Sequence, residues 1–189
     1  MTADDRRDAY EQWRQEERQR LLDAFTQARP AVFAAPGQLD PAVFAWLERF
    51  VQGDARTLLL GGRTGSGKTW SCWKAVETLL WNGWRGTWRI VSAYDLLRIV
   101  MPPVDETALD RLARADLLVI DDLGSMKVTD WASAHLHGLV DHRWSRKLPT
   151  IVTTNVPDIG ELVGERIASR LADGMESIAL AGKDQRRAR

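Results

Sequence analysis

The segment that most constrains the fold is GRTGSGKT, residues Gly62–Thr69, which follows the apolar run TLLL and precedes the helix-like stretch KTWSCWKAVETLLW. It matches the phosphate-loop pattern G-x-x-x-x-G-K-[ST] at every required position. Glycines let the backbone wrap around a phosphate, and the loop N–H groups and the start of the next helix supply partial positive charge. The alternative is a glycine-rich turn that matches by chance, and the flanking strand and helix argue against it. The segment predicts a nucleoside triphosphate site.

Apolar runs alternate with helical stretches along the rest of the chain. This alternation predicts an α/β fold with right-handed crossovers between parallel strands. The run DLLVI is apolar throughout, which is typical of a parallel strand buried on both faces. The expected strands after TLLL are TWRIV, DLLVI, TIVTT and SIALA, and the expected helices cover residues 93–100, 106–114, 130–146 and 158–173.

Polar residues end two of these strands. In LLVIDDLG, Asp121 suits a contact to Mg²⁺ at the carboxyl end of a strand, and Asp122 could activate a water as a general base. In TIVTTN, the amide of Asn155 could orient that water. The alternatives are a turn-forming Asp pair and a turn Asn before Pro157. For Asn155 considered alone, the turn is the favoured interpretation.

Two helices are expected before the phosphate loop. The first covers residues 4–28 and ends before Pro30; Glu17 interrupts its apolar stripe, so its amphipathic character is imperfect. Asp40 caps the second helix, which has Pro41 at its first position. The apolar members of the first helix are Tyr10, Trp13, Leu21, Leu22 and Phe25.

The bulk properties are those of an ordinary soluble globular protein, with 44% hydrophobic and 28% charged residues among 189. The formal net charge is zero, so no overall basic field points to nucleic acid. One cysteine, Cys72, fits a reducing compartment, and neither a secretory signal nor an apolar membrane span is apparent. A cytoplasmic location is therefore expected.

The series GRTGSGKT, DLLVIDDLG, LPTIVTTN and GERIASRL resembles the AAA+ ATPases of the DnaC/DnaI helicase-loader and IstB transposition-helper group. The resemblance covers about residues 39–186. It implies a P-loop AAA+ core with a five-stranded parallel sheet in the order 5-1-4-3-2, flanked by helices. The chain is shorter than typical loaders, so we expect a reduced or absent C-terminal lid. Residues 1–37 would form a helical appendage, a possible partner-docking segment, and residues 38–189 the ATPase core.

The resemblance also implies roles for individual residues. Lys68 would reach the β- and γ-phosphates of ATP, and Thr69 and Asp121 would hold Mg²⁺. Asp122 stands where many AAA+ members have a catalytic Glu. The other predicted nucleotide contacts are Gly62, Arg63, Thr64, Gly65, Ser66 and Gly67.

Three further catalytic positions follow from the same resemblance. Asn155 matches the sensor 1 residue, and Arg170 in GERIASRL matches an arginine finger that acts in trans on a neighbouring subunit; Arg166 is a weaker candidate. Arg186 in GKDQR matches the sensor 2 arginine, with the adjacent Arg187 left open.

The implied function is that of a DnaC-like loader, an ATPase that contacts single-stranded DNA and a replicative DNA helicase and associates with itself through a shared ATP site. An IstB-like transposition helper is the alternative. A small P-loop kinase fits less well, because the adjacent acids and Asn155 favour water as the acceptor. A non-hydrolysing adaptor that only binds nucleotide also fits less well, because Lys68, Thr69, Asp121 and Arg170 are all intact.

Two groups of basic residues are candidates for DNA contact. The first, Arg98, Arg111 and Arg114, lies in the helical insert before DLLVI; the second is Arg143, Arg146 and Lys147. Phosphate contacts from such residues are tolerant of sequence and sensitive to salt. The alternative for both groups is a set of solvated helix ends.

Overall fold

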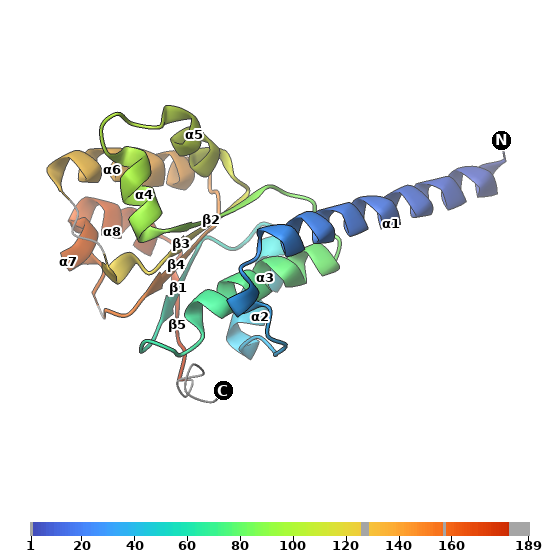
Figure 1. Ribbon diagram of the computed structural model, residues 1–189, viewed down its shortest axis with the longest axis horizontal. Helices are drawn as coiled ribbons and strands as arrows, with labels where there is room; N and C mark the ends of the chain where they lie inside the picture. The colour runs from blue at the N-terminus through green and yellow to red at the C-terminus, as the bar shows by residue number, and fades with distance from the viewer. Residues whose placement is uncertain (1, 126–128, 157, 182–189) are drawn as a thin grey trace.

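A five-stranded parallel sheet forms the centre of the computed structural model, in the order β2-β3-β4-β1-β5 (Figure 1). The strands are β1 Thr57–Gly61, β2 Trp88–Ser92, β3 Leu117–Asp121, β4 Thr150–Thr154 and β5 Glu176–Ala179. The predicted α/β class and strand order are confirmed. The structure describes residues 2–125, 129–156 and 158–181, with the backbone alone described at Ala3, Ser125 and Asp130.

Helices cover both faces of the sheet and form two cores. On one face lie α1 (Ala3–Ala28), the short helix η1 (Ala31–Phe33), α2 (Pro41–Gln52) and α3 (Lys68–Trp81). On the other face lie α4 (Ala93–Val100), α5 (Glu106–Arg114), α6 (Asp130–Ser145), α7 (Gly160–Val163) and α8 (Glu165–Ala172). Leu58 and Leu60 of β1 point into the first core and Leu59 into the second. This alternation is the period of two that an extended strand imposes, and it explains why β1 and β3 carry apolar residues on both faces.

The helix expected over residues 158–173 is interrupted. It forms α7 and α8, separated at Gly164, whose φ of 83° and ψ of 156° lie outside the helical region. A residue with a side chain rarely adopts this backbone conformation. The prediction of one continuous helix is therefore wrong, although Ile167 and Leu171 of α8 are buried as its apolar stripe requires.

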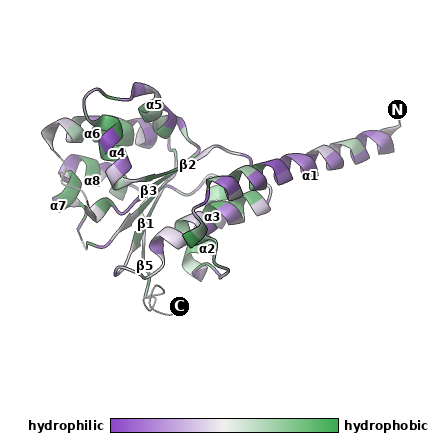
Figure 2. Cartoon of the chain, in the orientation of Figure 1, coloured by the Kyte–Doolittle hydropathy of each residue, from purple (hydrophilic) through white to green (hydrophobic). Residues whose placement is uncertain are grey.

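The N-terminal helix α1 is anchored to the core only through its last turns (Figure 1). Leu22 and Phe25 are buried against α3, and Arg29 pairs with Glu77 at 2.7 Å. Tyr10 and Trp13, expected on the same apolar stripe, are 56% and 49% exposed. The earlier part of α1 extends away from the sheet and is predominantly hydrophilic in Figure 2. Leu22 and Phe25 lie in the same core as residues of α3 and β1, and the division at residue 37 stays a prediction.

Within the described part of the chain, no helix combines the length and the apolar character that a membrane span needs.

Candidate nucleotide-binding site

The phosphate loop joins the end of β1 to the start of α3, as its sequence predicts. Gly67 caps α3 with a φ of 94°, a left-handed conformation that favours glycine. At Gly62 the constraint is space: a Cβ there would lie 2.7 Å from the carbonyl oxygen of Leu180 and 2.7 Å from Ser66 Oγ. The backbone therefore approaches its neighbours more closely than any other residue type allows at this position.

Lys68 lies inside this loop. Its Nζ donates hydrogen bonds to the carbonyl oxygens of Gly62, at 2.7 Å, and Arg63, at 3.0 Å. The side chain is buried despite its charge. Burial of an ammonium group without a partner is costly, so the loop carbonyls stabilise it where a phosphate is expected to bind.

Ser66 offers a second sign that the loop fits an anion. Its Oγ is buried and has no hydrogen-bond partner among the described residues. Buried hydroxyl groups are nearly always paired in folded proteins, so such an atom calls for an explanation. A phosphate oxygen bound in the loop would supply the missing partner.

Asp121 and Thr69 meet although they are 52 residues apart. The hydroxyl of Thr69 lies 3.0 Å from Oδ1 and 2.9 Å from Oδ2 of Asp121. The contact follows from the fold, because β3 and β1 flank β4 and their carboxyl ends meet at one edge of the sheet. A hydroxyl and a carboxylate at this distance are oxygen ligands of the kind that Mg²⁺ prefers.

Thr153 supports both acids. Its hydroxyl donates to Oδ1 of Asp121 at 2.7 Å and accepts from the backbone N–H of Asp122 at 2.8 Å. Asp122 itself has a φ of 59°, a left-handed conformation that Asp tolerates better than most residues. Sequence reasoning missed Thr153. The available signal was a polar residue inside the predicted strand TIVTT, since a hydroxyl buried there needs a partner.

Asn155 lies next to the turn that follows the acids. It is exposed, and a Cβ on Gly124 would come within 2.3 Å of its Oδ1. Gly124 belongs to the short helix η2 (Leu123–Ser125), directly after Asp122. The structure therefore brings the phosphate loop, Thr69, the two acids and Asn155 to one edge of the sheet.

Comparison with known proteins leads to the same group that the sequence resembles. The replicative helicase loader DnaC of Escherichia coli (strain K12) is 26% identical over 152 residues, which span 76% of this chain and 61% of DnaC. The crystal structure of the DnaC helicase loader superimposes with a TM-score of 0.65 at 21% identity, covering 74% of this chain and 86% of that one. The crystal structure of DnaI gives a TM-score of 0.65 at 23% identity, with coverages of 83% and 90%.

The chain shares the fold of the DnaC and DnaI structures. A replication initiator, DnaA bound to AMPPCP and single-stranded DNA, shares this fold with a TM-score of 0.63 at 16% identity, covering 77% of this chain and 47% of that one. No protein-family model matches the chain. The chain spans about three fifths of the length of the curated DnaC relatives that it matches.

Arg170 does not lie at the phosphate loop. Its Nε is 3.0 Å from Oδ1 of Asp141, and its guanidinium carbon is 3.9 Å from the centre of the Trp144 ring. It lines a pocket of about 530 Å³ together with Thr57 and Thr150, which begin β1 and β4. Arg170 therefore lies at the amino ends of the strands, opposite the phosphate loop.

The structure describes Arg166 but not the predicted sensor 2 residue Arg186. Arg166 is exposed on the first turn of α8, and no ion pair or hydrogen bond of its side chain is found among the described residues. Arg186 and the adjacent Arg187 lie outside the described residues.

The predicted surface cluster of Arg143, Arg146 and Lys147 is wrong at Arg143. This side chain is 2% exposed, whereas Arg146 and Lys147 are exposed. Burial lowers the pKa of Arg143 to about 10, with a smaller opposing effect of Asp116, so the group stays charged at neutral pH. Its guanidinium donates to Thr150 Oγ1 and to the carbonyl oxygens of Leu112, Ala113, Ala115 and Pro149. Arg143 thus joins α5, α6 and β4 and is unavailable to DNA.

The arginines of the helical insert are on the surface, as expected. Arg98 and Arg114 are exposed and lie 3.7 Å and 2.6 Å from Asp95 and Asp110 of their own helices. Arg111 is exposed as well. Ion pairs of this kind on a surface are weak, so they leave these side chains able to reach other groups.

Proposed function

We propose that this AAA+ chain binds and hydrolyses ATP as a DNA-replication accessory of the DnaC type. The observation that carries the proposal is the contact of Thr69 with Asp121 beside a phosphate loop that encloses a charged lysine. This combination supplies the phosphate cradle, the metal ligands and the acid in one place.

Each residue of the site has a distinct task. Lys68 exchanges its loop carbonyls for phosphate oxygens when ATP binds. Thr69 and Asp121 would hold Mg²⁺, which would supply charge that neutralises the phosphates. Asp122 accepts the proton of the attacking water, and Asn155 orients that water. Thr153 keeps the two acids in position through the hydrogen bonds it makes to both.

Arg170 is proposed to complete the site of a neighbouring copy. Its position at the opposite edge of the sheet separates it from the phosphate loop of its own chain, and its side chain keeps 36% of its surface exposed. An arginine finger stabilises the charge that develops during phosphoryl transfer and is worth on the order of 10³–10⁵ in rate. Arg166, one turn earlier and exposed, is the second candidate.

The proposed partners are single-stranded DNA and a replicative DNA helicase. Support comes from the name of the matched relative, a replicative helicase loader, and from the DnaA structure with single-stranded DNA. The exposed arginines of α4 and α5 are the proposed DNA contacts. An IstB-like transposition helper remains the alternative, with the same ATPase and a transposase in place of the helicase. Co-purification with one or the other from the native host distinguishes the two.

Phosphate release from ATP tests the reaction itself. We expect release in the presence of Mg²⁺ without any added acceptor, stimulated by single-stranded DNA. Lys68→Ala should abolish ATP binding. If phosphate appears only when a small-molecule acceptor is supplied, the chain is a kinase, and if ATP binds without turnover under any condition, it is a nucleotide-binding adaptor.

A mixing experiment tests the shared site. Arg170→Ala should retain ATP binding and lose hydrolysis, and Asp122→Asn should do the same. In an equal mixture about a quarter of the interfaces combine an intact acid with an intact finger, so activity should return. Arg166→Ala is the matched variant, and we expect it to hydrolyse ATP on its own. A mixture that stays inactive while both variants are folded and bind ATP would remove Arg170 from the site.

A further inference from the structure

The projecting part of α1 carries an aromatic pair that the core leaves uncovered. Tyr10 and Trp13 are 56% and 49% exposed, and their rings stack with centroids 5.9 Å apart. Large aromatic side chains that are exposed together are typical of contact surfaces. The helix around them extends away from the sheet (Figure 1), and isolated helices of this length are only marginally stable in water. This part of α1 is therefore suited to a partner.

The aromatic pair belongs to a seam of defined spacing. Arg6, Tyr10, Trp13 and Glu17 follow one another at intervals of four, three and four residues. These intervals place them on one side of a helix, at the two core positions of a heptad repeat. Phe25 and Leu22, which are buried against α3, are turned from Tyr10 by roughly 60° and 120°. Leu21, which continues the side of the seam after Glu17, is partly buried against the first core, so the free part of the seam ends near Glu17.

The order of residues along the seam is self-complementary. Read from either end it places a charged residue, two aromatic residues and a residue of the opposite charge. A second helix running antiparallel brings Arg6 against the partner's Glu17 and Tyr10 against the partner's Trp13. Core positions of the two kinds pair in this way across an antiparallel two-helix contact.

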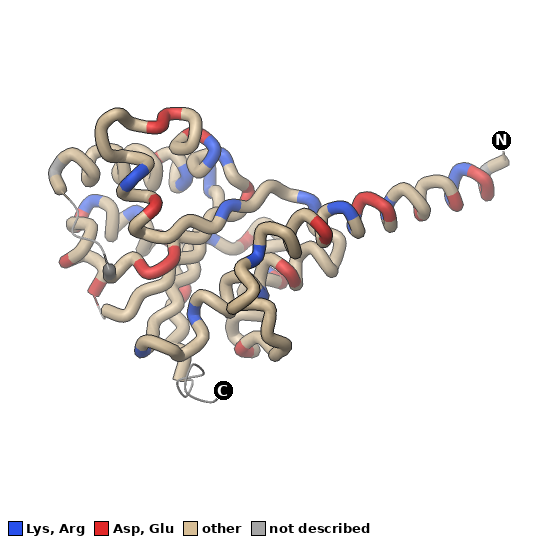
Figure 3. The backbone as a smooth tube through the Cα atoms, in the orientation of Figure 1, with Lys and Arg blue, Asp and Glu red and all other residues tan. Residues whose placement is uncertain are grey.

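Charges beside the seam agree with the same register. In this register Asp5 lies at the same height along the helix axis as the partner's Arg18, and Arg7 at the same height as the partner's Glu16. From residue 4 to residue 19, no two like charges fall at one height. Figure 3 shows acidic and basic residues alternating along α1. A parallel pair would set every charge against its own kind.

We propose that α1 binds α1 of a second copy of this chain in an antiparallel, twofold-symmetric contact. A twofold contact uses the same surface on both copies and closes on itself. It differs from the proposed shared ATP site, in which one copy donates an arginine to the next. It therefore forms without nucleotide and does not depend on the proposed function.

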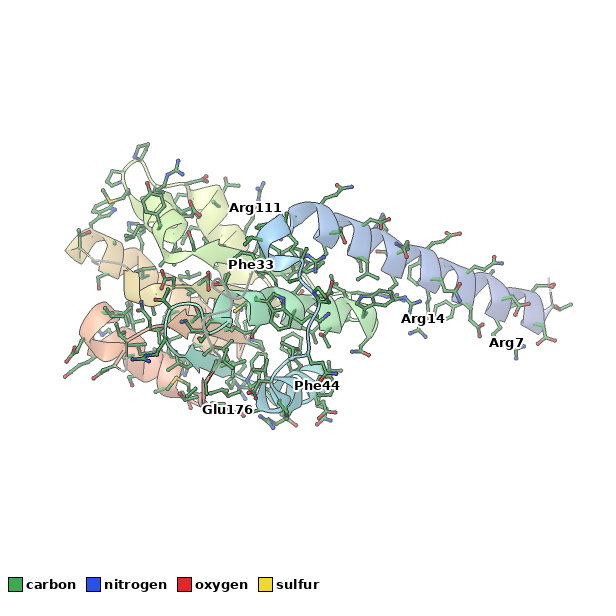
Figure 4. All side chains as sticks on the ribbon, turned by 60° about the horizontal axis from the view of Figure 1, so that its bottom comes forward. Arg7, Arg14, Phe33, Phe44, Arg111 and Glu176 are labelled. Carbon is green, nitrogen blue, oxygen red and sulfur yellow. The ribbon has the colours of Figure 1, made fainter. Side chains whose placement is uncertain are left out.

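Charge complementarity favours a copy of this chain over nucleic acid as the occupant. Glu17 stands at the end of the seam, where it would repel a phosphate backbone. Within the chain, Glu17 pairs with Arg20 at 2.9 Å, and the side chains of Arg20 and Glu17 are 76% and 23% exposed. The guanidinium of Arg85 lies 4.7 Å from the centre of the Trp13 ring. Figure 4 shows Arg7 and Arg14 projecting to one side of α1; the heptad spacing places both outside the seam.

Sedimentation equilibrium of the full chain without nucleotide is the first test. We expect a monomer–dimer equilibrium with a dissociation constant on the order of 10–100 µM, since a single helix pair is a small interface. Arg6→Glu and Glu17→Arg should each weaken the dimer about tenfold or more, because each replaces two opposite-charge contacts by two repulsive ones. Glu11→Arg makes the same change of charge on another side of α1 and should leave the constant unchanged.

Recombining the charges tests the direction of the helices. A chain that carries both Arg6→Glu and Glu17→Arg has the two charges exchanged. In an antiparallel dimer each charge again meets its opposite, so the dimer returns. In a parallel dimer each residue meets its own copy, and no opposite-charge contact is restored. Circular dichroism and thermal unfolding establish that each variant is folded.

Three results would overturn the proposal: a protein that stays monomeric throughout this range, a double variant that fails to recover the dimer, or equal effects of Glu17→Arg and Glu11→Arg. If the wild type is monomeric and Tyr10→Ala with Trp13→Ala removes binding of an oligodeoxythymidine, the aromatic pair serves nucleic acid instead.

Discussion

Thr153→Val removes one oxygen atom from the centre of the acidic site and keeps the shape of the side chain. Thr153 is 0% exposed, and its hydroxyl bridges Oδ1 of Asp121 and the backbone N–H of Asp122 at 2.7 Å and 2.8 Å. Valine leaves the N–H of Asp122 without this partner. Two hydroxyls hold the Asp121 carboxylate in the wild type, and only that of Thr69 remains in the valine variant.

The expected cost can be worked from these two bonds. A hydrogen bond to a charged group contributes about 1.5–3 kcal/mol, and valine returns part of this by avoiding burial of a hydroxyl, so we expect a loss of about 2 kcal/mol. For a chain of this size that is a fall in Tm of roughly 4–8 °C. The freed carboxylate of Asp121 no longer has a single orientation, and we expect ATP hydrolysis to slow about tenfold or more, equivalent to about 1.4 kcal/mol in the barrier.

Thr153→Ser is the matched control, because it keeps both bonds and loses a buried methyl group. That loss costs about 1 kcal/mol of stability, and it should leave the rate of phosphate release near that of the wild type. Differential scanning calorimetry and a steady-state phosphate assay measure the two effects separately. A valine variant that hydrolyses ATP at the wild-type rate, or a serine variant as slow as valine, refutes the positioning role of Thr153.

Three further substitutions probe the phosphate loop and two basic side chains of α6. Arg143→Met should lower the free energy of unfolding by about 3 kcal/mol in urea titrations, since it leaves several carbonyl oxygens unpaired, and should leave the affinity for single-stranded DNA unchanged. Burial, reinforced by Arg146, lowers the pKa of His142 from the model-peptide value of 6.5. Because the unfolded chain then binds a proton at a higher pH than the folded one, the free energy of unfolding decreases as the pH falls below about 7. His142→Gln should make the free energy of unfolding depend less on pH in urea titrations between about pH 5 and 7. Gly62→Ala places a Cβ 2.7 Å from the Leu180 carbonyl oxygen and should weaken binding of a fluorescent ATP analogue about tenfold or more.

Local sequence patterns determined the elements of this protein. The loop GRTGSGKT, the run LLVIDD and the capping residue Asp40 act through backbone geometry and periodicity over a few residues. Such signals depend mainly on neighbouring residues in the sequence. The strands and most helices therefore begin and end close to where they are expected. The interruption of the last helix at Gly164 was not predicted, because a glycine within a helical pattern is compatible with both a continuous helix and a break.

Tertiary structure alone decided which side chains meet and which are covered. The contact between Thr69 and Asp121 spans 52 residues, and that between Thr153 and Asp121 spans 32. Arg143 looked like a surface cation because its neighbours in sequence are polar; it is buried because carbonyl oxygens 28–31 residues away surround it. The apolar residues of α1 are divided as well, since Leu22 and Phe25 face α3 and are buried, whereas Tyr10 and Trp13 point in other directions and are exposed. Periodicity identifies which residues share a side of a helix, and the neighbouring elements decide which sides are buried.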